Sequence, residues 1–275
     1  METELIGVPF DGYGRAGDQA GAAGALRRAG LARALGPHAV RDAGDLRLPP
    51  FERVRGPRTG LLNEPALLAM TDQLNARVAA AAAAGRFPVV AGGDCASLLG
   101  IVTGLRDALG RVGLLLVDGH EDTMPVDVVE DGEAANCEIG LLLGLTGRLL
   151  ADPLAARLPA LDLAALAMIG QRDGAWRRRF NVGSLADLGA WSRPLATMRA
   201  EPCRRGPRRG AAPARRGRAL VAAPRSRCPR SRGLPGAGAA GPAGRAGRAG
   251  PGGARRCPHE RGRRGRLRRD ERGDL

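Results

Sequence analysis

The segments PVVAGGDC (residues 88–95) and LLLVDGHED (residues 114–122) each place a short apolar run directly before glycine and acidic residues. An uninterrupted apolar run of this length is typical of a strand that is buried on both faces of a parallel sheet. Two further runs of this kind occupy residues 5–9 and 165–169. Together with the runs at 88–91 and 113–117, they predict four parallel strands.

Segments of helical periodicity lie between these runs, at residues 25–35, 64–84, 97–109 and 133–143. Strands that alternate with helices in this way are typical of a βαβ architecture. We therefore expect a three-layer α/β/α domain with a mostly parallel sheet over residues 1–200. Periodicity is lost after residue 198, so we expect this sheet to be truncated, with its far strands absent or mispaired.

The last third of the chain has a different composition. Residues 1–200 contain 21 Arg and 23 acidic residues, whereas residues 201–275 contain 22 Arg and 5 acidic residues. This second segment also lacks Ile, Phe, Tyr, Trp and Met. Such a segment has little apolar surface with which to offset the entropy of ordering its backbone. We predict a disordered basic tail over residues 201–275.

Several classes of protein are disfavoured by the sequence. The first ten residues carry Glu2 and Glu4 and lack the pattern of a signal peptide, and no apolar stretch approaches the roughly 18 residues of a membrane span. The chain has 5 cysteines at irregular spacings without a CxxC pair, which favours neither a disulfide framework nor a zinc ribbon. We expect a cytoplasmic protein without a membrane partner.

Acidic and imidazole side chains follow the third predicted strand. Asp118, His120 and Asp122 alternate, so in an extended segment they point to one side. Two carboxylates and an imidazole suit manganese, and also zinc or iron. Residues beyond the carboxyl ends of parallel strands meet at one edge of the sheet, where ligands bind. The alternative is a solvated loop, with Gly92 and Gly93 simply making a tight turn.

The ordered series of motifs resembles that of the ureohydrolase family, which includes arginases and agmatinases. The resemblance covers about residues 1–200. It rests on GGDC (92–95), VDGHED (117–122), GEAANCEIGLLLG (132–144), the start IGVPFDGYGRAGDQAGAAGALRRAGL (6–31), and AMIGQRDGAW (167–176).

This resemblance implies a binuclear Mn²⁺ site, in which a metal-bridging hydroxide attacks the carbon of a guanidino or linear amidine compound and a C–N bond is hydrolysed. By position, Asp118 would bridge the metals, and His120 and Asp122 would each hold one of them. Asp118 and His120 are thus the implied catalytic residues, and Asp94 would orient the site. Family members commonly assemble into trimers or hexamers, which implies a homo-oligomer.

The sequence departs from the family pattern at three places. Cys95 stands where the commonest pattern has a histidine ligand, and its thiolate is a softer metal ligand. No histidine occurs near Asn136, although arginases carry one there; Glu133 and Asn136 become the candidates for a substrate loop. The DxDxxDP motif that supplies the remaining metal carboxylates is missing. We therefore expect at most a partial metal site and an impaired enzyme.

The tail itself suggests why the motif is missing. Each Arg-Ser or Arg-Cys step in RSRCPRSRG (225–233) can hide an aspartate codon one nucleotide later, and the three steps have the spacing of DxDxxD. With permitted codons, residues 220–232 read in the shifted frame give WWLHLDLDVLDP. Our interpretation is that the tail is a frameshifted translation.

Two other functions remain open at this stage. The chain could be a non-catalytic α/β protein whose Arg-rich arm binds polyanions through phosphate charge, without sequence specificity because the arm has no aromatic residues for base stacking. It could also be a relative that keeps the fold without catalysis, since a fold does not imply a function.

Overall fold

The computed structural model describes residues 1–14, 19–36, 39–146 and 154–201, together with the backbone of residues 218–223. All described residues belong to one compact unit, Met1–Pro229. The predicted disorder of residues 201–275 therefore falls almost wholly outside the described residues.

Every pairing between the described strands is parallel, and these strands form two sheets rather than the one that we expected. The strands of the first sheet, in spatial order, are β2 (Val40–Asp45), β1 (Thr3–Gly7) and β3 (Phe87–Ala91). Those of the second are β6 (Trp191–Arg193), β5 (Leu166–Ile169), β4 (Arg111–Val117) and β7 (Arg218–Ala223). The four predicted strands are confirmed, each to within two residues at either end.

Three of the described strands were not predicted from the sequence. β2 (VRDAGD) is an edge strand that mixes charged and small residues, and it is partly exposed, so it carries no apolar run. β6 has only three residues, too few to establish a pattern. β7 corrects the expectation that no regular structure follows residue 198, because it pairs with the central strand β4.

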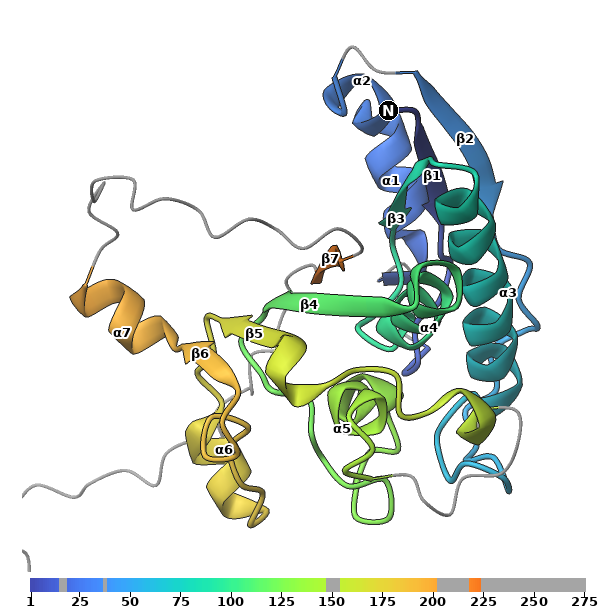
Figure 1. Cartoon of the computed structure of the whole chain (residues 1–275). Coiled ribbons are helices and arrows are strands. Elements are labelled where there is room, and N and C mark those ends of the chain that lie inside the picture. Colours follow the sequence, from blue (N-terminus) through green and yellow to red (C-terminus); the bar gives the residue numbers. More distant parts are fainter. Residues whose placement is uncertain (15–18, 37–38, 147–153, 202–217, 224–275) are drawn as a thin grey trace, which may run out of the picture. The chain divides into compact units, whose positions relative to one another are not determined.

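Helices pack against the sheets as predicted (Figure 1). They are α1 (Ala22–Arg28), α2 (Leu31–Ala34), α3 (Glu64–Ala83), α4 (Ser97–Leu109), α5 (Glu138–Leu142), α6 (Gly174–Arg179) and α7 (Leu195–Ala200). The predicted helix at 25–35 is divided by Gly30, whose φ of 89° belongs to the left-handed region. The predicted helix at 133–143 begins as a 3-10 turn, Ala134–Asn136. Among the described helices, none is long and apolar enough to cross a membrane.

The helices α3 and α4 pack side by side, and they meet through two glycines (Figure 1). A Cβ on Gly104 would lie 2.5 Å from the backbone oxygen of Asn75, and one on Gly100 would lie 2.8 Å from Leu74 Cβ. Close by, Asn75 Nδ2 donates a hydrogen bond of 3.0 Å to Thr103 Oγ1. The close approach of these helices fixes α4, and α4 begins directly after the GGDC segment.

This contact predicts the effect of one substitution. Gly104→Ala should destabilise the chain by about 1–3 kcal/mol, because the added methyl group meets backbone rather than a flexible side chain. The matched control is Gly24→Ala in α1, where the nearest atom is the mobile end of Arg28 at 3.3 Å. The control should stabilise by about 0.5–1 kcal/mol, since alanine favours a helix. Urea unfolding measures both; equal effects would contradict the packing described.

Candidate metal centre

The GGDC turn after β3 requires its two glycines. Gly92 and Gly93 have φ of 89° and 75°. A Cβ on Gly92 would lie 2.9 Å from both the backbone nitrogen of Ala23 and the backbone oxygen of Val8. The two glycines thus make a tight turn, as the alternative interpretation of this segment predicted. The turn places Asp94 and Cys95 at the start of α4.

Asp94 joins two loops that lie far apart in the sequence. Its Oδ2 accepts a hydrogen bond of 2.7 Å from the backbone of Gly12, in the loop after β1, and its Oδ1 accepts one of 3.0 Å from the backbone of Ala96. The side chain is buried. This arrangement supports the predicted role of Asp94 in orienting the site, although that role stays a prediction.

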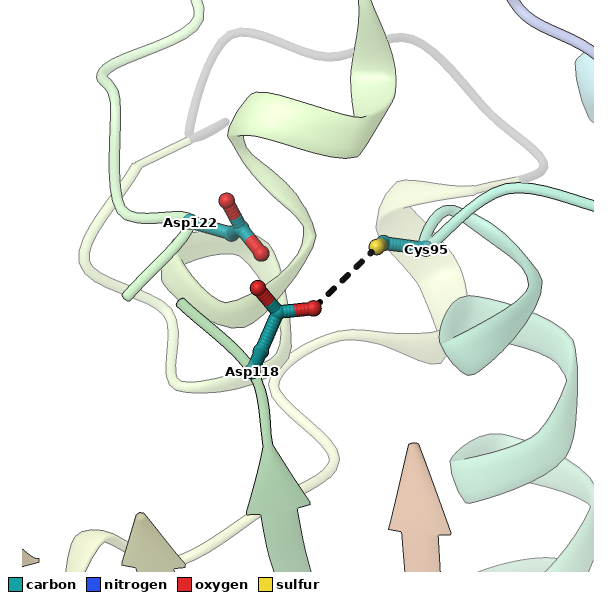
Figure 2. A group of neighbouring side chains, drawn as sticks. All are labelled: Cys95, Asp118 and Asp122. Carbon is teal, nitrogen blue, oxygen red and sulfur yellow. Dashed lines mark hydrogen bonds between the residues drawn. The ribbon is translucent and has the colours of Figure 1, made fainter. Parts of the chain in front are cut away.

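Three predicted metal ligands lie together. One ligand atom each from Cys95, Asp118 and Asp122 lies within 4.8 Å of the others, and all three residues are buried. Figure 2 shows Asp118 just beyond the tip of β4, with the thiol of Cys95 directed at its carboxylate; the Sγ to Oδ2 distance is 3.8 Å. These three residues are called the Cys95 cluster below.

The geometry that brings Asp118 and Asp122 together differs from the expected strand. The chain bends at Asp118, and the backbone nitrogen of His120 donates a hydrogen bond of 3.0 Å to Asp118 Oδ1. Asp122 has a φ of 48°, in the left-handed region. His120 Nδ1 lies 3.6 Å from Asp118 Oδ1, but His120 is not part of the Cys95 cluster. Its roles as ligand and catalytic residue stay predictions.

A buried ionic network, which no sequence motif indicated, holds this bend in place. Arg177 Nη2 lies 3.0 Å from Glu121 Oε1, and Arg177 Nε lies 3.2 Å from Asp173 Oδ2. The same Asp173 oxygen accepts a hydrogen bond from the backbone nitrogen of Glu121. Asp173 belongs to the GQRD motif, but nothing in the sequence pattern pointed to Arg177.

The two candidate substrate-loop residues, Glu133 and Asn136, have different partners in the structure. Glu133 lies with Asp11 and Asp94, and one ligand atom from each of these three lies within 4.8 Å of the others. Asn136 instead donates through Nδ2 to Asp131 Oδ2, at 2.9 Å. Glu133 therefore lies beside Asp94, whereas the amide of Asn136 is engaged on the loop itself.

Buried negative charge dominates the electrostatics of the Cys95 cluster. Burial, followed by the charge of Glu138, raises the pKa of the Cys95 thiol well above its usual value. Burial and the charge of Asp118 raise the pKa of Asp122, and burial and Asp122 raise the pKa of Glu138. Acids so placed ionise readily only when a cation neutralises them.

A divalent cation fits these residues. Asp122 Oδ2 and both carboxylate oxygens of Glu138 are buried, and in the described part of the chain their one available hydrogen bond is a proton shared between the two acids. Lone pairs left unsatisfied in this way are suited to a metal ion. A thiolate among carboxylates favours zinc or iron more than an all-oxygen site would, and so moves the preference away from manganese.

A cavity of about 760 Å³ adjoins Asp118. It lies beyond the ends of β4 and β5 and is also lined by residues of α7. Its charged lining residues are Asp118, Arg172 and Arg199. The cavity thus offers one anionic and two cationic groups beside the Cys95 cluster.

Comparison with known proteins gives a consistent result. The model of the arginase family matches residues 1–175. An arginase from Eremothecium gossypii is 38% identical over 103 residues, which are 38% of this chain and 26% of the relative. An arginase from Staphylococcus aureus is 29% identical over 175 residues, or 62% of this chain and 57% of the relative. The chain thus spans from a quarter to somewhat over half of the length of these relatives.

Among solved structures, the arginase from Bacillus caldovelox has a similar fold. The TM-score is 0.61 at 24% identity, and the superposition covers 73% of this chain and 67% of that chain.

The raised pKa values predict how stability depends on pH in the metal-free chain. A carboxyl group whose pKa is raised by folding stabilises the protein below its unfolded pKa, and this contribution is lost as pH rises through the folded pKa. The Asp122→Asn variant has no such group and so does not lose this contribution. Its free energy of unfolding minus that of the unchanged chain should therefore increase from about pH 5 to about pH 8. Urea unfolding in the presence of a chelator measures this difference. A difference that is constant or shrinks with pH would contradict the buried acidic cluster.

Proposed function

The chain belongs to the arginase family, and from this premise we propose that its fold serves the metal-dependent hydrolysis of a non-peptide C–N bond in a guanidino or linear amidine compound. The observation that carries the proposal is the convergence of Cys95, Asp118 and Asp122 at the carboxyl ends of β3 and β4. Three buried ligands from two strand ends are the arrangement that a catalytic cation needs.

Each part of the cluster has a role in this proposal. A bound divalent cation supplies Lewis acidity and lowers the pKa of water. Cys95, Asp118 and Asp122 hold that cation, and Asp94 keeps the loops after β1 and β3 in position. His120, whose Nδ1 lies 3.6 Å from Asp118, is assigned as a further ligand on the more exposed side. Two Mn²⁺ ions are proposed for a complete site, of which this chain holds part.

The cavity beside Asp118 supports a class of substrate. Arg172 and Arg199 can pair with a carboxylate, while Asp118 places the proposed cation at the same cavity, where the reacting guanidino or amidine carbon would lie. We therefore propose a guanidino or amidine compound that also carries a carboxylate. A cytoplasmic location and self-association remain predictions.

The impairment of this chain and the frameshift are part of the same proposal. β7 runs parallel to β4, with Ala223 opposite Leu116. In the shifted frame, the first aspartate of DxDxxD would fall two positions after Ala223 in the sequence, just as Asp118 falls two positions after Leu116. This matched spacing supports the interpretation that the missing carboxylates belong beside Asp118.

The frameshift predicts a nucleotide sequence. Codons 195–235, read in all three forward frames, should yield an apolar strand followed by DxDxxDP after a one-base shift. If no frame yields this motif, the Arg-rich tail is genuine, and the proposal of an impaired binuclear enzyme is overturned.

The activity of the protein gives a separate test. Urea release from a panel of guanidino compounds should require a divalent metal, and a chain with the frame restored should exceed the present chain by roughly 100-fold or more, because ligands are restored. Asp118→Asn should abolish activity in the restored chain, whereas Glu130→Gln, at an exposed position, should leave it unchanged. Equal activity of the present and restored chains would contradict the impairment.

A further inference from the structure

The guanidinium group of Arg172 lies directly against Gly119, which stands between Asp118 and His120 in the bend after β4. A Cβ on Gly119 would lie 2.5 Å from Arg172 Cζ, and 2.6 and 2.8 Å from its Nη1 and Nη2 atoms. These distances are too short for any real Cβ, so the guanidinium occupies the space that another side chain would fill. Glycine at position 119 is therefore what lets Arg172 lie here.

Backbone contacts bring Arg172 to this position. Its backbone nitrogen donates a hydrogen bond of 2.8 Å to the carbonyl oxygen of Gly119, and the backbone nitrogen of Asp118 donates one of 3.1 Å to the carbonyl oxygen of Ile169. Arg172 Nη1 also donates to the carbonyl oxygen of Gly170, at 3.4 Å. These bonds join the loop after β4 to the loop after β5, so the place of the guanidinium follows from the backbone on both sides.

Arg172 is available to a ligand. It is exposed, and it lines the cavity of about 760 Å³ together with Gly119, Asp118 and Arg199. Among the described residues, no carboxylate forms an ion pair with Arg172 or with Arg199. A guanidinium group presents parallel N–H donors that match the two oxygens of a carboxylate. The cavity wall thus carries a carboxylate-binding group beside the bend that holds Asp118.

We propose that Arg172 determines specificity by binding a carboxylate of the substrate, and that Gly119 is a positioning residue that makes room for its guanidinium. The inference rests on the proposed function and assigns residues to the recognition of the substrate. Because Gly119 follows Asp118 directly, the carboxylate and the reacting carbon would share one cavity. A substrate without the carboxylate would lose the contact with Arg172.

Equilibrium binding to the full 275-residue chain tests the role of Arg172. The probes are 4-guanidinobutanoate and its primary amide, which differ only in the carboxylate, and ligand-observed NMR gives both Kd values. The unchanged chain should prefer the acid by about tenfold, and Arg172→Gln should lose about fivefold of this preference, as expected for an exposed ion pair. The matched control is Arg178→Gln, an exposed arginine that does not line the cavity, and it should keep the preference.

A substitution at Gly119 tests the positioning role. The added methyl group of Gly119→Ala meets the mobile end of Arg172 and no backbone atom. The variant should therefore fold, with the guanidinium displaced and the preference for the acid reduced as in Arg172→Gln. Gly183→Ala is the control, since a Cβ there meets nothing within 4 Å, and it should leave the preference unchanged.

The double variant Gly119→Ala/Arg172→Gln separates positioning from a general structural effect. If Gly119 acts through Arg172, the double variant should match Arg172→Gln alone. A further loss of preference, as large as that of Gly119→Ala alone, would overturn the positioning role. Where Gly119→Ala does not fold, the double variant should fold again because the guanidinium is gone, and a double variant that also fails to fold overturns the same role.

The remaining outcomes distinguish this inference from the proposed function. Equal binding of acid and amide by the unchanged chain would overturn the role of Arg172 and leave the proposed function standing, because both probes carry the guanidino group. A preference that survives Arg172→Gln in full would do the same. Binding of neither probe also overturns the inference, and the metal dependence of urea release then decides the proposed function separately.

Discussion

The concentration of buried negative charge at the strand ends is the constraint on which the rest of the site depends. Asp118, Asp122 and Glu138 are almost fully removed from water, and Cys95 lies with the two aspartates. Taken alone, these acids oppose folding when they ionise, because burial disfavours the charged form. A cation bound among these acids would neutralise their charge, so that the ionised residues would stabilise the folded chain instead of opposing folding.

The surrounding structure keeps this charge in place through contacts that need no metal. Asp94 ties the loop after β1 to the loop after β3, while Glu121, Asp173 and Arg177 tie the loop after β4 to the loop after β5. Because these partners are buried and charged, the loops they join have few alternative positions. The proposed ligands thus lie on a rigid edge, which is what a metal site requires.

The sequence predicted the elements with strong local signals and missed those that depend on tertiary contacts. Apolar runs revealed β1, β3, β4 and β5, whereas the edge strand β2 is polar and partly exposed and so has no such run. The grouping of Cys95, Asp118 and Asp122 was predicted, but for the wrong geometric reason, since a bend and not an extended strand brings the two aspartates together. Glu138 was missed because its single local signal, the apolar run that follows it in α5, is weak.

X-ray absorption at the metal edge of the zinc-loaded full chain tests the central claim most directly, because it identifies the atoms bound to the ion. The account predicts one sulfur scatterer, from Cys95, together with oxygen scatterers from the carboxylates, and loss of the sulfur signal in Cys95→Ser. A spectrum with oxygen scatterers alone, unchanged by that substitution, would contradict the claim that the strand ends of β3 and β4 hold a divalent cation.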